Sequence, residues 1–145
     1  MARILVIDDD ADTRAMLEQI LKRADYEVIL AADGREGVER HSTGPADLVI
    51  TDIYMPKQGG LETIREFRMR FPEVSIIAMS GKALAVTMLS IAQDFGAVAV
   101  LHKPFAAEEL IAAVANALGG KSSAILNAMR QPGWVAESIS SRLYC

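Results

Sequence analysis

The sequence is poor in cysteine, with a single one, Cys145, at the last of 145 positions. A disulfide framework is therefore excluded, the Cys145 thiol is expected to be inert, and we expect a cytoplasmic protein, since thiols stay reduced there. Long apolar runs are missing too, because no stretch approaches the roughly 18 residues of a membrane-spanning helix. The first residues also lack the basic and apolar regions of a signal peptide. We therefore expect no membrane partner.

Runs of basic residues are also missing, and the formal net charge is −4. Nucleic-acid affinity depends on clustered cations, so the domain by itself is expected to make no direct nucleic-acid contact. Hydrophobic residues form 51% of the chain and charged residues 23%, which is typical of a globular domain. No internal repeat or low-complexity tract interrupts the sequence. Its length of 145 residues predicts one domain.

Short β-prone apolar runs alternate with helical patterns along most of the chain. The runs predict strands at 3–7, 27–31, 47–51, 74–79 and 98–101. The helical patterns predict helices at 35–41, 61–71, 83–95 and 106–118, and a first helix capped by Asp12 or Thr13 and ending near Ala24. This alternation with short connections predicts an α/β fold, a doubly wound five-stranded parallel sheet with right-handed crossovers and helices on both faces.

Polar side chains follow the predicted strands at their carboxyl ends. The residues in these positions are Asp8, Asp9 and Asp10 after the first strand, Asp52 at the third, Ser80 after the fourth and Lys103 after the fifth. With the strand order 2-1-3-4-5, the first and third strands are neighbours, so Asp8, Asp9 and Asp52 would share one crevice. Two carboxylates about 4 Å apart repel by roughly 4 kcal/mol at an effective dielectric of 20. Such a cluster raises a pKa, binds a cation, or does both.

Carboxylate and carbonyl oxygens are the ligands that Mg²⁺ prefers, and such an ion commonly shares its shell with a phosphate. Lys103 and Ser80 would add an ammonium and a hydroxyl, so that Asp52 could attack phosphorus and form an aspartyl phosphate. Each residue also has an ordinary explanation, since aspartates cap helices, serines occupy turns and lysines are usually solvated. Their conjunction at one sheet edge favours the phosphate chemistry. His41 and His102 have no convergent partner and are interpreted as structural.

The strand-end motifs, taken together and in this order, resemble those of a known family. They are Ile4-Leu5-Val6-Ile7-Asp8-Asp9, Thr51-Asp52-Ile53-Tyr54-Met55-Pro56, Ser80-Gly81 and Lys103-Pro104-Phe105. Each motif is weak alone, but the set is similar to that of the receiver domain of bacterial response regulators, the chemotaxis-regulator-like domain of two-component systems. The resemblance covers residues 2 to about 119. It implies the flavodoxin-like (βα)5 receiver fold.

The resemblance implies a role for each polar residue at this edge except Asp10, to which no direct role is assigned. Asp52 would be the phosphoacceptor, taking its phosphoryl group from a sensor histidine kinase or phosphotransfer protein. Asp9, Asp52 and the backbone carbonyl of Tyr54 would bind Mg²⁺, with Asp8 acting through a water. Ser80 would contact the phosphoryl oxygen as the switch residue. Lys103 would pair with another phosphoryl oxygen, and the Lys103-Pro104 peptide bond would be cis.

The resemblance also implies what the domain does. It would be a phosphorylation-controlled switch that assists its own phosphotransfer and autodephosphorylation, and not an enzyme acting on an external metabolite. The signal would pass through the surface formed by the helix 83–95, the strand 98–101 and the helix 106–118. The apolar character of the helix 83–95 makes this surface a candidate for homodimer formation. Val100 stands where many receivers have an aromatic switch residue, so an aromatic side-chain swing is not expected.

Two other classes of protein are alternatives. A haloacid-dehalogenase-type phosphohydrolase also uses an aspartate after an apolar strand, and Asp8-Asp9-Asp10 contains an Asp-x-Asp, but that interpretation leaves Asp52 without a role. A flavodoxin-like or pseudo-receiver binding module without phosphorylation is the second. No Gly-rich or Ser/Thr-rich phosphate loop follows the first strand, which argues against a bound nucleotide or flavin.

The predicted domain organisation is a receiver domain at 1–120 and a C-terminal tail or truncated linker at 121–145, partly helical or disordered. The sequence contains no recognisable output domain. The expected recipient of the signal is therefore a downstream target protein or an output domain missing from these residues.

Overall fold

The computed structural model describes residues 1–53, 59–81 and 85–119, without the side chains of 85–89. Its strands are β1 (Arg3–Ile7), β2 (Glu27–Ala31), β3 (Leu48–Asp52), β4 (Ser75–Ser80) and β5 (Ala99–His102). Its helices are α1 (Ala11–Arg23), α2 (Gly34–Thr43), α3 (Gly60–Arg70), α4 (Ala85–Asp94) and α5 (Ala107–Ala117). These elements confirm the predicted alternation, with boundaries shifted by one or two residues at most ends.

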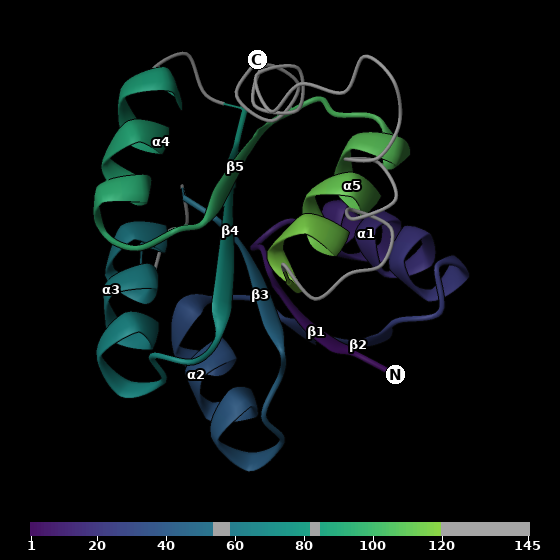
Figure 1. The fold of residues 1–145 in the computed structure, drawn as a ribbon, viewed down its shortest axis with the longest axis horizontal. Coiled ribbons are helices and arrows are strands. Elements are labelled where there is room, and N and C mark those ends of the chain that lie inside the picture. The colour runs from purple at the N-terminus through teal and green to yellow at the C-terminus, as the bar shows by residue number, and fades with distance from the viewer. Residues whose placement is uncertain (54–58, 82–84, 120–145) are drawn as a thin grey trace.

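The strands form one parallel sheet in the order β2-β1-β3-β4-β5, as predicted. Figure 1 shows α1 and α5 covering one face of this sheet, and α2, α3 and α4 covering the other. Every crossover brings the chain back to the same end of the sheet, so all five carboxyl strand ends lie along one edge. The β1–β3 register pairs Ile7 with Thr51, which sets Asp8 and Asp52 next to each other beyond the last pair.

The core has two layers, one on each face of the sheet. On the α1/α5 side, alternate strand residues such as Val6, Ile50 and Met79 pack against Leu17 of α1 and Leu110 of α5. The intervening strand residues pack on the other face against α2, α3 and α4. Both faces of each central strand are therefore buried, which explains why these strands are continuous apolar runs.

The first helix begins earlier than predicted, and its cap is a different residue. Asp10, not Asp12 or Thr13, is the N-cap, with extended backbone at φ −89° and ψ 115°. The Asp10 carboxylate accepts hydrogen bonds from the Asp12 amide at 3.2 Å and from the Thr13 hydroxyl at 2.7 Å. Asp10, Asp12 and Thr13 are all favoured at N-caps, and Asp10, three residues after the end of β1, is the one with extended backbone at the helix start.

Helix α3 starts in close contact with the end of β3. Gly60 is its first residue, and the Gly60 amide donates to the Ile53 carbonyl at 2.9 Å. A Cβ atom added at Gly60 would collide with the Asp52 carbonyl oxygen and with Ile53 Cα, which are both backbone atoms. Glycine is therefore required at this position by space rather than by backbone conformation.

Several predictions concern residues that the structure leaves undescribed. The Tyr54 carbonyl and the tail 121–145 lie outside the described residues, as do the side chains of the apolar residues 84, 86, 88 and 89 of the expected helix 83–95. Of that predicted stripe, Ile91 is half-buried and Phe95 is exposed. Among the helices of the described ranges, none has the length and apolarity that crossing a bilayer demands.

Candidate functional site: an acidic pocket at the strand ends

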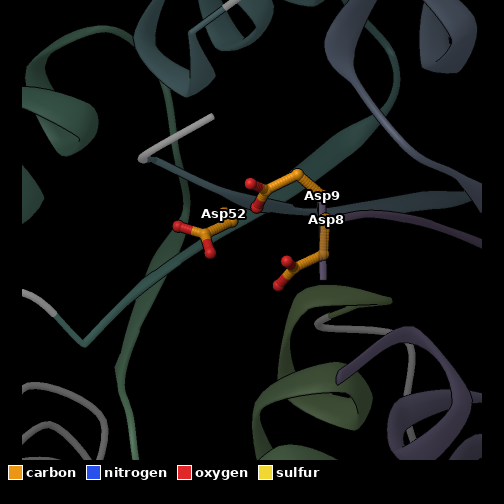
Figure 2. A group of neighbouring side chains, drawn as sticks. All are labelled: Asp8, Asp9 and Asp52. Atoms are coloured by element: carbon orange, nitrogen blue, oxygen red, sulfur yellow. The ribbon is translucent and has the colours of Figure 1, made fainter. Parts of the chain in front are cut away.

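The carboxylates of Asp8, Asp9 and Asp52 meet at the carboxyl ends of β1 and β3. One ligand oxygen from each residue lies within 4.8 Å of the others. Figure 2 shows the three side chains converging on a common space beside these strand ends. Asp8 is fully buried and Asp52 is almost so, while Asp9 is exposed. The structure therefore brings together the three acidic residues that the sequence placed in one crevice.

Lys103 reaches this pocket from the end of β5. Its Nζ atom lies 2.9 Å from Asp8 Oδ2 and 2.9 Å from Asp52 Oδ2, so one ammonium bridges two carboxylates. The Lys103 backbone amide also donates to the Ser80 carbonyl at 2.8 Å, which ties this loop to the end of β4. A Cβ at Gly81 would lie 3.1 Å from Lys103 Cβ, so glycine leaves room for the lysine stem. The Lys103-Pro104 bond is cis, as expected.

The charges in this pocket do not balance. Burial raises the pKa of Asp8, and this effect exceeds the opposing hydrogen bonds from the Asp10 amide and Lys103. Burial alone would lower the pKa of Lys103, but its hydrogen bonds to Asp52 and Asp8 raise the pKa above its usual value. Among the described residues, three carboxylates therefore share one ammonium that is held in its charged form. A cation is the natural complement to such a set.

The loop between β1 and α1 is held by contacts from several directions. The Asp8 amide donates to the Ala31 carbonyl at 3.1 Å, and the Asp10 amide donates to Asp8 Oδ1 at 2.9 Å. Arg14 Nη1 donates to the Asp8 carbonyl oxygen at 2.6 Å. Hydrogen bonds from Thr13 and Asp12 lower the pKa of Asp10 and keep this cap ionised. The sequence analysis assigned Asp10 no role and did not consider Arg14. The available signal was the spacing, because Arg14 lies one helical turn after Asp10 and can reach back to the loop before the helix.

Ser80 closes β4 and is fully buried. Met79 is the register partner of Asp52, so Ser80 lies one residue beyond it on the neighbouring strand. Val100 is a buried core residue of β5. His41 is buried between α2 and α3, away from the pocket, in agreement with its interpretation as structural.

The donor set of the pocket fits Mg²⁺. Hard oxygen ligands, at least two of them carboxylates, are what this ion takes, and it keeps several waters besides. Asp9 is exposed, Asp52 accepts from Lys103, and Asp8 accepts from both Lys103 and the Asp10 amide. These three carboxylates are the described residues that could hold such an ion.

Comparisons with known proteins agree with this geometry. A family model described as the response regulator receiver domain matches residues 4–115. The chain is 38% identical over 110 residues to the response regulator MprA of Mycolicibacterium vanbaalenii, covering 76% of this chain and 47% of that protein. It is 36% identical over 121 residues to the DNA-binding transcriptional regulator NtrC of Azospirillum brasilense, covering 83% of this chain and 25% of that protein.

Among solved structures, a response regulator receiver domain protein from Clostridium thermocellum superposes with a TM-score of 0.77 at 32% sequence identity. The match covers 81% of this chain and 94% of that one. The chain thus corresponds to nearly all of a receiver structure, but it spans only about half of MprA and a quarter of NtrC.

Proposed function

The chain belongs to the response regulator receiver domain family, whose members act in phosphorylation-regulated signalling, and we propose that Asp52 is its phosphoacceptor. The observation that carries the proposal is the bridging ammonium of Lys103, 2.9 Å from both Asp8 and Asp52. A nucleophilic carboxylate needs a nearby positive charge, but the partner that supplies this charge must be able to release the carboxylate oxygen that attacks. A partly exposed lysine on a loop meets both needs.

The transfer follows from the chemistry of the residues. An Asp52 carboxylate oxygen attacks the phosphorus of a phosphohistidine, and a P–O bond forms as the P–N bond breaks. The electron pair leaves with the imidazole nitrogen, which takes up a proton. Lys103 then exchanges a carboxylate oxygen for a phosphoryl oxygen, so its ammonium stabilises the charge that accumulates during the transfer. Ser80, at the end of the adjacent strand, supplies a hydroxyl to the same group.

Asp9 and Asp52, with the Tyr54 carbonyl, would hold Mg²⁺ directly, and Asp8 would do so through a water. When bound, the ion neutralises phosphoryl oxygen charge. The ion pair between Asp8 and Lys103 joins the end of β1 to the end of β5 and so holds the two sides of the pocket together.

Phosphorylation acts as a switch because it adds roughly −1.5 to −2 charge and three strong acceptor oxygens at Asp52. Ser80 and Lys103 would contact phosphoryl oxygens only in that state, and such a difference in interaction shifts the conformational population. Ser80 precedes α4 in the chain, and Lys103 lies between β5 and α5. The surface formed by α4, β5 and α5 would therefore relay the change. It is also the candidate surface for a homodimer.

The partners are those that the family relation suggests for the whole protein. Phosphate would come from a sensor histidine kinase or phosphotransfer protein, in the cytoplasm. The signal would pass to a target protein or to an output domain, such as the one by which a related regulator binds DNA. The receiver itself would contact no nucleic acid or membrane.

The experiment that tests the proposal is Phos-tag gel retardation of the chain after incubation with acetyl phosphate and Mg²⁺. We expect a retarded band for the unmodified chain, its loss in Asp52→Ala, and its retention in Asp94→Ala, which removes an exposed aspartate from the end of α4. A retarded band that persists in Asp52→Ala would contradict Asp52 as the acceptor.

Asparagine variants at Asp52 and Asp8 separate the alternative functions. A phosphohydrolase with Asp8 as nucleophile would hydrolyse p-nitrophenyl phosphate in Asp52→Asn and lose this activity in Asp8→Asn. A binding module without phosphorylation would show no retarded band under any of these conditions. The match to receivers over residues 4–115 and the Asp52–Lys103 ion pair support the phosphoacceptor.

A further inference from the structure

Arg14 contacts the loop between β1 and α1 at this end of the sheet, and the proposed chemistry gives it no role. It lies in the first turn and a half of α1, four residues after the N-cap Asp10, and is half-buried. Its Nη1 atom donates to the backbone carbonyl of Asp8 at 2.6 Å. A charge-assisted hydrogen bond of this length is among the strong polar contacts of a protein.

A cation is electrostatically disfavoured at this place. The N-terminus of a helix carries partial positive charge, which favours acidic side chains there and opposes basic ones. Helical side chains lean toward the N-terminus, so Arg14 projects back over the turn that precedes α1. The arginine therefore reaches the Asp8 carbonyl against the helix dipole, which points to a compensating role for this contact.

The carbonyl that Arg14 binds belongs to the peptide unit that joins Asp8 to Asp9. Fixing that oxygen fixes the plane of the peptide, and with it the direction in which the Asp9 side chain leaves the backbone. Asp8 is held independently, by its amide on Ala31 and by its carboxylate on Lys103 and the Asp10 amide. Asp9 is exposed, so its direction depends on the backbone that carries it.

We propose that Arg14 is a positioning residue for the metal site, orienting the Asp9 carboxylate through the Asp8 carbonyl. This inference rests on the proposed function, since it assumes that Asp9 binds Mg²⁺. Groups that orient metal ligands typically account for about 10- to 100-fold in metal affinity. Arg14 contacts the backbone several covalent bonds from the Asp9 carboxylate rather than the ligand itself. We therefore expect the lower end of this range.

A purely electrostatic role for Arg14 predicts the opposite result. The guanidinium is a positive charge near a site for a divalent cation, and its removal would strengthen cation binding if charge were its whole effect. Positioning and charge therefore differ in the sign of the change in affinity. Lysine in place of Arg14 separates them further, because it keeps the charge but loses the planar fork of donors.

The test is a Mn²⁺ titration of the full chain, with free Mn²⁺ measured by electron paramagnetic resonance, for the unmodified chain and for Arg14→Gln and Arg14→Lys. Arg23→Gln, at the exposed far end of α1, is the matched control for charge. Circular dichroism verifies that each variant is folded at the titration temperature. Phosphorylation by acetyl phosphate is measured in parallel against Mg²⁺ concentration.

We expect the Kd for Mn²⁺ to rise about 10-fold in Arg14→Gln, by less in Arg14→Lys, and not in Arg23→Gln. The Mg²⁺ concentration for half-maximal phosphorylation should rise in parallel, while the rate at saturating Mg²⁺ stays within about twofold, a separation that general loss of structure does not produce. Unchanged or tighter Mn²⁺ binding in Arg14→Gln would overturn the positioning role alone. Absence of Mn²⁺ binding in the unmodified chain would overturn the proposed metal site and this inference with it.

Discussion

The two ends of β3 each lie beside a buried polar group, and the two groups are partnered in different ways. Near the amino end, His41 Nδ1 accepts a hydrogen bond from the Ala46 amide at 3.0 Å. Its ring packs edge-on against Phe67 and Phe71, with centroids 5.3 and 4.4 Å away. At the carboxyl end, Asp52 shares the Lys103 ammonium with Asp8 in a cluster of like charges.

The difference distinguishes a structural polar group from a functional one. Burial lowers the pKa of His41 and so favours its neutral form, and the ring is held by packing and by one backbone hydrogen bond. The acidic pocket is compact but carries excess negative charge, so its resting state costs free energy that a bound cation or a rearranged lysine would recover. Buried polar residues point to function where their charges lack compensation, rather than where they are merely buried.

The largest expected effect comes from Gly60→Ala, because α3 serves both regions. Its first residue lies against the backbone of Asp52 and Ile53. Its last turn carries Phe67 and its C-cap is Phe71, and both rings pack against His41. The added methyl group must displace the helix, so we expect the free energy of unfolding to fall by about 3 kcal/mol, at the upper end for overpacking. Chemical denaturation measures this change.

Gly59→Ala is the matched control for this substitution. A Cβ at Gly59 meets nothing within 4 Å, and its φ of −63° suits alanine. We expect its free energy of unfolding to stay within about 0.5 kcal/mol of the unmodified value. Equal destabilisation by the two alanines would mean that conformational freedom, and not the close approach at Asp52, explains glycine at position 60.

The next effect is expected in Lys103→Met, which sharpens the contrast in charge. Removal of one partner from a buried ion pair costs about 3–5 kcal/mol. Lys103 is 24% exposed, so we expect a loss of about 2 kcal/mol in EDTA. Mg²⁺ should restore part of this stability, since a cation bound by the folded state alone raises the free energy of unfolding.

Lys22→Met controls for the loss of a lysine. Its ion pair with Glu18 is on the surface, where the lysine is 59% exposed, so less than about 0.5 kcal/mol should change and Mg²⁺ should have no added effect. If Lys103→Met were destabilised equally in EDTA and in saturating Mg²⁺, charge compensation would not be what Lys103 supplies.

A smaller effect of opposite sign is expected from Asp8→Asn. Because the pKa of Asp8 is raised in the folded state, the folded protein binds more protons than the unfolded chain between the two pKa values. Stability contributed by Asp8 is therefore lost as pH rises through that window. Neutral asparagine should raise the free energy of unfolding at pH 7 in EDTA by about 1 kcal/mol, with a smaller gain near pH 4. Urea denaturation at both pH values checks this, and a stability decrease at pH 7 would contradict it.

Much of the fold and site could be predicted because the decisive information is local. Continuous apolar runs identify strands buried on both faces, and the strict alternation with helices determines a parallel sheet. Once the strands are parallel, residues directly after them must share one edge, which is why Asp8, Asp52 and Lys103 could be brought together without coordinates.

The missed features depend on the three-dimensional path of the backbone. Asp10, Asp12 and Thr13 are all good capping residues, and which of them caps α1 depends on where the backbone turns from extended to helical. The Arg14 contact depends on which carbonyl that turn presents. The need for Gly60 arises from the approach of α3 to β3, which no spacing in the sequence reports.

The smallest expected effect concerns the amino end of β3, where His41 gives a pH dependence of folding without any metal dependence. Burial lowers the His41 pKa in the folded state, while nearby Glu73 opposes this shift, and the unfolded value is about 6.5. Below pH 6.5 the unfolded chain therefore holds a proton that the folded protein lacks, so the free energy of unfolding decreases as pH falls from about 7 toward the folded-state pKa. Between pH 7.5 and 5.5 the His41 contribution should fall by up to about 1 kcal/mol.

The measurement is chemical denaturation at both pH values, in EDTA and in Mg²⁺, for the unmodified chain and for His41→Asn. Asparagine offers an acceptor to the Ala46 amide but does not titrate, so the variant should be less stable overall and should lose the His41 part of the pH dependence. The difference between the two proteins cancels pH effects that they share. That difference should be the same with and without Mg²⁺, because His41 lies at the other end of β3 from the acidic pocket. An Mg²⁺-dependent difference would show that the two ends of β3 are energetically coupled, and that the structural and functional polar groups are not independent.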